Sequence, residues 1–168
     1  MKLYLVRHAA AVDRTAAMSD EERYLTPEGR DFFRKTARTM LGKGIDPDLI
    51  ITSPLLRAVQ TADVLAETLS YRGPLVVRNE LQPGFAMPAL LRLLNEFRTV
   101  SELALVGHEP DLSGITTALL ALPYGLSFRK GTAVKLKIDT TELPAPATFK
   151  WLATGGKVIA SREEAFGF

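Results

Sequence analysis

The sequence contains no cysteine, which excludes a disulfide scaffold, a thiolate metal site and a cysteine nucleophile, and fits a reducing compartment. It also lacks an apolar run that could cross a membrane, because the most apolar later stretch, residues 103–123, contains His108, Glu109 and Asp111. Near the N-terminus, Arg7 comes too soon for the hydrophobic core of a secretion signal. We therefore expect a soluble, cytoplasmic protein without a membrane partner.

An excess of charge of one sign is also missing. The 21 lysine and arginine residues and the 19 aspartate and glutamate residues leave a net charge of +2. The basic residues form no dense stripe, so we expect no nucleic-acid partner. No glycine-rich phosphate loop or dinucleotide fingerprint is present either, and nucleotide binding is not indicated. A chain of 168 residues with ordinary globular composition predicts one domain over residues 1–168.

Short apolar runs alternate with longer segments of helical period. Buried strands are predicted at residues 3–6, 49–52, 75–78 and 102–106. Helix start signals follow at Thr26-Pro27, Ser53-Pro54, Pro88 and Pro110. This alternation predicts an α/β fold, a single three-layer domain with a mainly parallel sheet and helices on both of its faces.

The last third of the chain has a different pattern. Apolar and polar residues alternate over residues 134–138 and again over residues 149–153, which predicts two half-exposed, antiparallel edge strands. Residues 143–146 are expected to form the loop between these strands. No secondary structure is predicted for the tail from Gly155 onward.

Only two histidines occur in the chain, and both follow predicted strands. His8 comes after the first strand, directly behind Arg7, and His108 comes after the fourth. Ser53 follows a third strand, with Arg57 one turn into the next helix. Ligands of open α/β sheets bind beyond the carboxyl ends of the strands. We therefore expect Arg7, His8, Arg57 and His108 to converge on one pocket.

Two guanidinium groups and two imidazoles suit a tetrahedral oxyanion such as phosphate. Arginine pairs with phosphate oxygens through two donors and keeps its charge near neutral pH. A neutral imidazole offers a lone pair for in-line attack on phosphorus. Ser53 is expected to cap the following helix and to contact the phosphate, and the amides at that helix N-terminus would add further donors.

Other uses of these residues deserve comparison. A single histidine behind a strand is more often structural than catalytic, so the inference depends on the pair. The histidines with Asp13 or Glu109 would make a poor metal site, because Arg7 and Arg57 repel a cation and zinc takes three or four protein ligands. We expect no metal. A serine hydrolase is disfavoured because Ser53 lacks the glycines of a nucleophile elbow.

With these residues in place, the sequence resembles the histidine phosphatase superfamily. Three blocks carry the resemblance: residues 5–9, Leu-Val-Arg-His-Ala, with Ala9 in place of the usual glycine; residues 53–62; and residues 106–108. Residues 25–29 and 80–84 resemble the same group. The order of the blocks and the short chain are most similar to the SixA-type protein histidine phosphatases. The resemblance weakens beyond His108.

The resemblance implies a phosphoglycerate mutase-like fold and a phosphohistidine intermediate on His8. Arg7, Arg57 and His108 would complete the phosphate pocket, and no cofactor is implied. The chain lacks the long helical insertion of larger relatives, so the exposed site suits a phosphohistidine-bearing protein domain as partner. Two alternatives stay open: hydrolysis or transfer of the phosphoryl group of a small phosphate ester, and a non-catalytic phosphate-binding module. Ala9 is expected to narrow the backbone approach to the phosphate.

The proton donor for a leaving group is the least defined feature. Glu80, Glu109 and Asp13 lie near predicted strand ends. Glu109 is expected to cap a helix, whereas Glu80 is the candidate for contact with substrate. Without an evident acid, phosphohistidine is favoured, because imidazole leaves more readily than an alkoxide. Residues 13–23 are expected to form a solvated loop, from which Arg14 could contact the phosphate.

Overall fold

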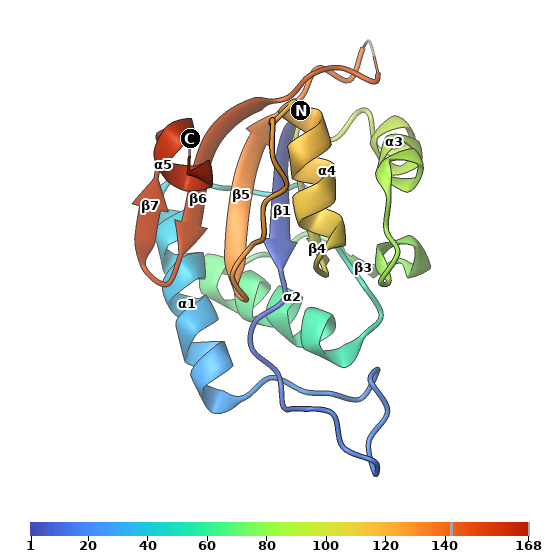
Figure 1. Cartoon of the computed structure of the whole chain (residues 1–168), viewed down its shortest axis with the longest axis vertical. Coiled ribbons are helices and arrows are strands. Elements are labelled where there is room, and N and C mark those ends of the chain that lie inside the picture. Colours follow the sequence, from blue (N-terminus) through green and yellow to red (C-terminus); the bar gives the residue numbers. More distant parts are fainter. Residues whose placement is uncertain (142, 168) are drawn as a thin grey trace.

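The computed structural model describes residues 1–141 and 143–167. Within these residues a seven-stranded sheet forms the centre, in the order β3-β2-β4-β1-β5-β6-β7 (Figure 1). The strands are β1 (Lys2–Arg7), β2 (Leu49–Thr52), β3 (Leu75–Val77), β4 (Glu102–Gly107), β5 (Thr132–Lys137), β6 (Thr148–Thr154) and β7 (Lys157–Ile159).

Helices cover both faces of this sheet. They are α1 (Pro27–Gly42), α2 (Leu56–Leu69), the short 3-10 helix η1 (Asn79–Leu81), α3 (Met87–Glu96), α4 (Asp111–Leu119) and α5 (Arg162–Phe166). Successive side chains of a strand point to opposite faces of the sheet, so one strand contributes to the hydrophobic core on each face. Leu3 and Leu5 of β1 pack with α3 and α4, whereas Tyr4 and Val6 pack with α1 and α2. The predicted three-layer α/β architecture is confirmed.

The predicted elements of the first two thirds are confirmed to within a few residues. Strand β2 has the predicted bounds, and β1 and β4 each extend to include the residue before the histidine. Helix α1 begins as its start signal predicts. Thr26 is its N-cap and accepts a hydrogen bond from the amide of Gly29 at 3.0 Å, while Pro27 fills the first turn.

The sheet is more evenly mixed than expected. Strands β3, β2, β4 and β1 are parallel to one another, and β5, β6 and β7 add antiparallel pairs. The two predicted antiparallel strands are confirmed as β5 and β6, and residues 143–146 lie between them as expected. The tail contains the third, β7, and helix α5, which sequence periodicity did not reveal because both are short.

None of the helices in residues 1–141 and 143–167 combines the length and the apolar character needed to span a membrane.

Candidate active site

The carboxyl ends of three parallel strands lie side by side. Arg7 of β1 pairs in register with Gly107 of β4. The ladder continues one residue further, because the amide of His8 donates to the carbonyl of Gly107 at 3.1 Å. The amide of Ser53, which follows β2, donates to the carbonyl of Val106 at 3.0 Å. His8 and Ser53, which follow β1 and β2, are therefore held to β4 by backbone hydrogen bonds.

The four residues predicted to converge do line one cavity, of about 420 Å³. The rings of His8 and His108 have centroids 5.2 Å apart, and Arg57 Nε donates to His8 Nε2 at 3.3 Å. Both rings are largely enclosed, with 7% and 3% of their residues' surface exposed, yet both reach the cavity wall. The cavity is also lined by Arg14, Asp20, Arg23, Pro83, Glu109 and Lys130.

The His8 ring is fixed in one tautomer. Its Nδ1 lies 2.7 Å from the carbonyl oxygen of Ala9, which can only accept a hydrogen bond. Nδ1 therefore carries the hydrogen and Nε2 keeps its lone pair. Burial lowers the pKa of His8 to about 3, and the nearby charges of His108, Arg57 and Arg7 act in the same direction. At neutral pH the ring is uncharged, with Nε2 available as a nucleophile.

The His108 ring is held from the other nitrogen. Its Nε2 lies 2.7 Å from the hydroxyl oxygen of Ser53, which accepts from the amide of Leu55 at 3.3 Å. Nε2 is the only acceptor that the described residues offer to the serine hydrogen, so the ring hydrogen is placed on Nδ1, which is itself buried without a partner among those residues. Burial, followed by the charge of Arg57, lowers the pKa of His108 to about 4. His108 is therefore a neutral donor suited to an oxyanion.

Ser53 occupies a different position from the one expected. Helix α2 begins at Leu56, with Leu55 as an N-cap that makes no side-chain hydrogen bond. Ser53 is fully buried, is not part of the cavity wall and holds His108 instead of capping the helix. The first amide of α2 is also engaged, because Leu56 donates to the carbonyl of Glu21 at 3.0 Å. The expected anion contacts from Ser53 and from that amide are therefore not supported.

Both arginines of the predicted set are anchored. Arg7 donates through Nη1 to the carbonyl of Phe128, and its Nε is buried without a partner among the described residues. Burial lowers the pKa of Arg7 from its ordinary value, but a guanidinium remains charged near neutral pH. Arg57 is buried and donates through Nη1 to the carbonyl of Asp20 at 2.6 Å and through Nη2 to its carboxylate at 3.0 Å.

Asp20 is a cavity residue that sequence reasoning missed, as are Arg23, Pro83 and Lys130. It accepts hydrogen bonds from Arg14 at 3.2 Å and Arg23 at 2.9 Å as well as from Arg57. Burial acts to raise the pKa of Asp20, but these three arginines outweigh it and hold the pKa below its usual range. The segment 13–23 is largely exposed, as expected for a solvated loop, and Asp20 and Glu21 tie it to the start of α2. Asp20 is one of three consecutive acids between Arg14 and Arg23, so no signal in the sequence singled it out.

The predicted accessory residues separate into two groups. Arg14 lines the cavity as expected, although it is exposed and bound to Asp20. Glu80 does not line it: both carboxylate oxygens bond Arg78, at 2.7 and 3.3 Å, and these bonds lower the pKa of Glu80. The expected contact of Glu80 with substrate is therefore not supported by the geometry. Asp13 is likewise absent from the cavity wall.

Glu109 lines the cavity beside His108. It precedes Pro110, the N-cap of α4, and is hydrogen-bonded to Ser113 in the first turn of that helix. Its Oε1 is buried without a partner among the described residues. Burial raises the pKa of Glu109, against the lowering effects of Ser113 and Arg7. Besides its expected place at the helix start, Glu109 is thus a carboxyl group able to hold a proton in the cavity.

Ala9, the departure from the usual glycine, lies outside the cavity wall. Its side chain belongs to the core packed against α1 and α2, and its amide donates to the hydroxyl of Thr61 at 3.0 Å. The expected narrowing near the phosphate is therefore not seen. For metal ions, residues 1–141 and 143–167 contain no cluster of three histidine or carboxylate side chains.

Comparison with known proteins agrees with this geometry. The family model for the histidine phosphatase superfamily, branch 1, matches residues 3–83. An uncharacterized protein of Picosynechococcus sp. is 33% identical over 149 residues, 86% of this chain and 90% of the relative. Phosphohistidine phosphatase SixA of Escherichia coli is 33% identical over 156 residues, 90% of this chain and 92% of the relative. The solved structure of protein histidine phosphatase SixA with tungstate superposes with a TM-score of 0.82 at 24% identity, covering 92% of this chain and 97% of that one.

Proposed function

Because the chain belongs to the histidine phosphatase superfamily, we propose that it removes the phosphoryl group from phosphohistidine on a signalling protein. One observation carries the proposal: a neutral His8, whose unprotonated Nε2 is held by Arg57, lies in a cavity lined by four arginines and a lysine. Similarity to SixA over most of both chains supports phosphohistidine as the substrate class.

In the first step, His8 Nε2 attacks the phosphorus atom of the bound substrate. The P–N bond of the substrate breaks, its electron pair passes to the departing imidazole, and that imidazole takes up a proton from solvent. The phosphoryl group is now bonded to His8 Nε2. Arg7, Arg57 and the Nδ1 hydrogen of His108 stabilise the charge on the phosphoryl oxygens during this transfer.

In the second step, water attacks the phosphorus atom of phospho-His8. The bond from phosphorus to Nε2 breaks, the lone pair returns to His8, and the proton lost by the water leaves with the phosphate or solvent. The hydrogen bond from Nδ1 to the Ala9 carbonyl keeps the ring in the tautomer needed for the next cycle. No cofactor takes part in either step.

One observation favours a second candidate, hydrolysis of a small phosphate ester. An alkoxide leaving group needs a proton donor, and Glu109 is a cavity residue with a raised pKa. The substitution Glu109→Gln separates the candidates. If the enzyme acts on phosphohistidine, Glu109→Gln changes kcat on a phosphohistidine protein by less than about threefold. If it acts on esters, kcat on its best ester falls by about 10²-fold, as expected for loss of a general acid.

The direct test of the proposed function is release of inorganic phosphate from a phosphohistidine-bearing domain, compared with sugar and glycerate phosphates under the same conditions. We expect the phosphoprotein to be preferred in kcat/KM by at least tenfold, and His8→Asn to abolish release. Preference for an ester would overturn the substrate class. Phosphate binding without turnover of any substrate would leave a non-catalytic module.

Two further properties remain predictions. We expect activity to be independent of metal ions, so dialysis against a chelator should leave kcat unchanged, and restoration of a lost activity by one added metal would contradict this. A cytoplasmic location, expected from the sequence, is tested by fractionation of the source cells.

A further inference from the structure

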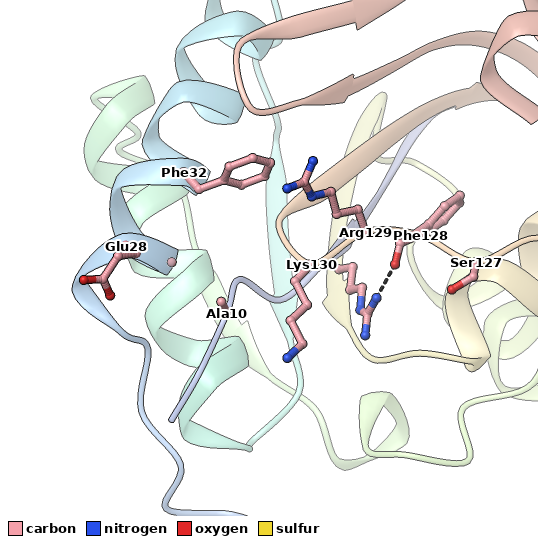
Figure 2. Close-up of a pocket in the computed structure, with 9 residues that line it drawn as sticks. Ala10, Glu28, Phe32, Ser127, Phe128, Arg129 and Lys130 are labelled. Atoms are coloured by element: carbon pink, nitrogen blue, oxygen red, sulfur yellow. Dashed lines mark hydrogen bonds between the residues drawn. The ribbon is translucent and has the colours of Figure 1, made fainter. Parts of the chain in front are cut away.

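A second cavity, of about 600 Å³, adjoins the phosphate pocket and shares Arg7 and Lys130 with it. Figure 2 shows Glu28 and Phe32 on one side, Phe128 on the other, and Arg129 and Lys130 between them. We call this second cavity the flanking groove. Its volume lies in the range of cavities that hold a drug-sized ligand. The phosphoryl group and the imidazole of a phosphohistidine would not fill it in addition to the phosphate pocket.

The aromatic wall of the flanking groove is held in place. The ring of Phe32 packs so closely on the backbone of Gly155 that a Cβ atom there would lie 2.5 Å from it, and a Cβ on Gly131 would lie 3.0 Å from it. Arg129 stacks over the same ring, with its guanidinium carbon 5.1 Å from the ring centroid. Arg7 donates a hydrogen bond to the carbonyl of Phe128, which ties the opposite wall to the end of β1.

The charge of the flanking groove is positive. Three cationic side chains line it, those of Arg7, Arg129 and Lys130, against a single carboxylate, that of Glu28. Among the residues that the structure describes, the Lys130 side chain makes no hydrogen bond or ion pair. Within the same residues, the Arg129 guanidinium has one interaction, the cation–π contact with the Phe32 ring. Both side chains are exposed. An occupant with an apolar stem and an anionic end would satisfy the aromatic and cationic groups together.

We propose that the flanking groove binds an acidic residue, aspartate or glutamate, next to the phosphohistidine in the protein substrate. The inference rests on the proposed function, since the phosphoryl group must occupy the neighbouring pocket. Because Arg7 and Lys130 belong to both cavities, a polypeptide whose phosphohistidine enters one has its adjacent residues at the mouth of the other. The groove would thus read the sequence around the phosphohistidine through charge.

The experiment uses the full chain and three substrates: a phosphohistidine peptide with acidic flanks, the same peptide with amide flanks, and phosphoramidate as a minimal phosphoryl donor. The test variant is Arg129→Glu. The matched control is Lys137→Glu, an exposed residue at the opposite end of β5 that changes the net charge equally. We expect unchanged enzyme to prefer the acidic peptide by about tenfold in kcat/KM. In Arg129→Glu this preference falls at least tenfold, through KM, whereas Lys137→Glu retains it.

Equal kcat/KM for the acidic and amide peptides, or a preference that survives Arg129→Glu, would overturn the proposed role of the flanking groove. Hydrolysis of phosphoramidate would in that case still support the phosphatase activity. Failure to hydrolyse any of the three substrates would instead overturn the proposed function. If a sugar phosphate assayed beside these three substrates lost more kcat/KM in Arg129→Glu than the acidic peptide does, the groove would belong to a small-molecule substrate and the proposal would be contradicted. Thermal unfolding of both variants checks that each is folded.

Discussion

The ends of β1 and β4 are neighbours in register, and each is followed by a histidine. The two histidine rings, however, are hydrogen-bonded to the protein through different nitrogen atoms. His8 is bonded through Nδ1 to a backbone carbonyl, so its Nε2 carries the lone pair and accepts a hydrogen bond from Arg57. His108 is bonded through Nε2 to the hydroxyl of Ser53, which leaves Nδ1 free. One strand end therefore presents a lone pair and the other a hydrogen. In each ring, the hydrogen-bond partner of one nitrogen determines whether the other nitrogen acts as a nucleophile or as a hydrogen-bond donor. The position of the histidine behind a strand does not determine this.

The largest difference is expected between substitutions of the two rings. His8→Asn removes the nucleophile and should lower kcat by about 10⁴-fold or more. His108→Asn removes one donor and should cost about 10²- to 10³-fold. Steady-state phosphate release from a phosphohistidine protein measures both. Equal losses for the two variants would mean that the rings act as one unit.

Arg57 contacts the histidine that follows β1, because its Nε donates a hydrogen bond to His8 Nε2. Arg57→Gln removes a buried charge from the phosphate pocket and should lower kcat/KM by about 10²- to 10³-fold. Arg14→Gln, at an exposed side chain bound to the same Asp20, should change it by less than about threefold. The same kinetic assay applies, with thermal unfolding as the folding check. A large loss in Arg14→Gln would place that arginine on the phosphate as well.

A smaller effect is expected from the hydroxyl groups behind the two strand ends. Ser53→Ala frees His108 Nε2 and should lower kcat/KM about tenfold, the equivalent of one hydrogen bond. Thr61→Val removes the partner of the Ala9 amide, and so loosens the β1 end without touching either ring. It should affect the midpoint of urea unfolding more than kcat. The reverse order of the two variants in kcat/KM would contradict the assigned role of Ser53.

The two buried imidazoles should also make stability depend on pH. Their folded-state pKa values, about 3 and about 4, lie below the ordinary value of 6.5, so the unfolded chain binds more protons as the pH falls. Stability should be unaffected above pH 6.5 and decrease below it, by about 2 kcal/mol per ring at pH 5. Urea unfolding at pH 7 and pH 5 measures the decrease, and the double variant His8→Asn/His108→Asn should lose less. An equal loss in the double variant would assign the effect to carboxylates.

The sequence allowed the strand ends to be predicted because their signals are local. The apolar runs at residues 3–6 and 102–106 end directly before the histidines, and parallel strands place such ends at one edge. Helix α1 was equally predictable from Thr26 and Pro27. The convergence of Arg7, His8, Arg57 and His108 therefore followed from the predicted strand ends, whereas Arg23 and Lys130 of the same cavity were not predicted.

The contacts between segments were not predictable in the same way. Asp20 is one of many acids in a charged segment, and only folding brings it to Arg57. Ser53 has the sequence context of a helix cap, but its hydroxyl faces His108 because the ladder to β4 holds its backbone. Glu80 was misplaced because Arg78, two residues away, captures its carboxylate. Each error concerns which of several suitable partners a polar side chain meets.

The most direct measurement is rapid chemical quench of the enzyme during turnover of a phosphohistidine protein, followed by mass spectrometry of the intact chain and its peptides. One phosphoryl group per chain, stable to base and lost in acid, should be found on His8. It should be absent from His8→Asn and still detectable in His108→Asn. Phosphate found on His108, or steady turnover without any phosphorylated enzyme, would contradict attack by His8 Nε2.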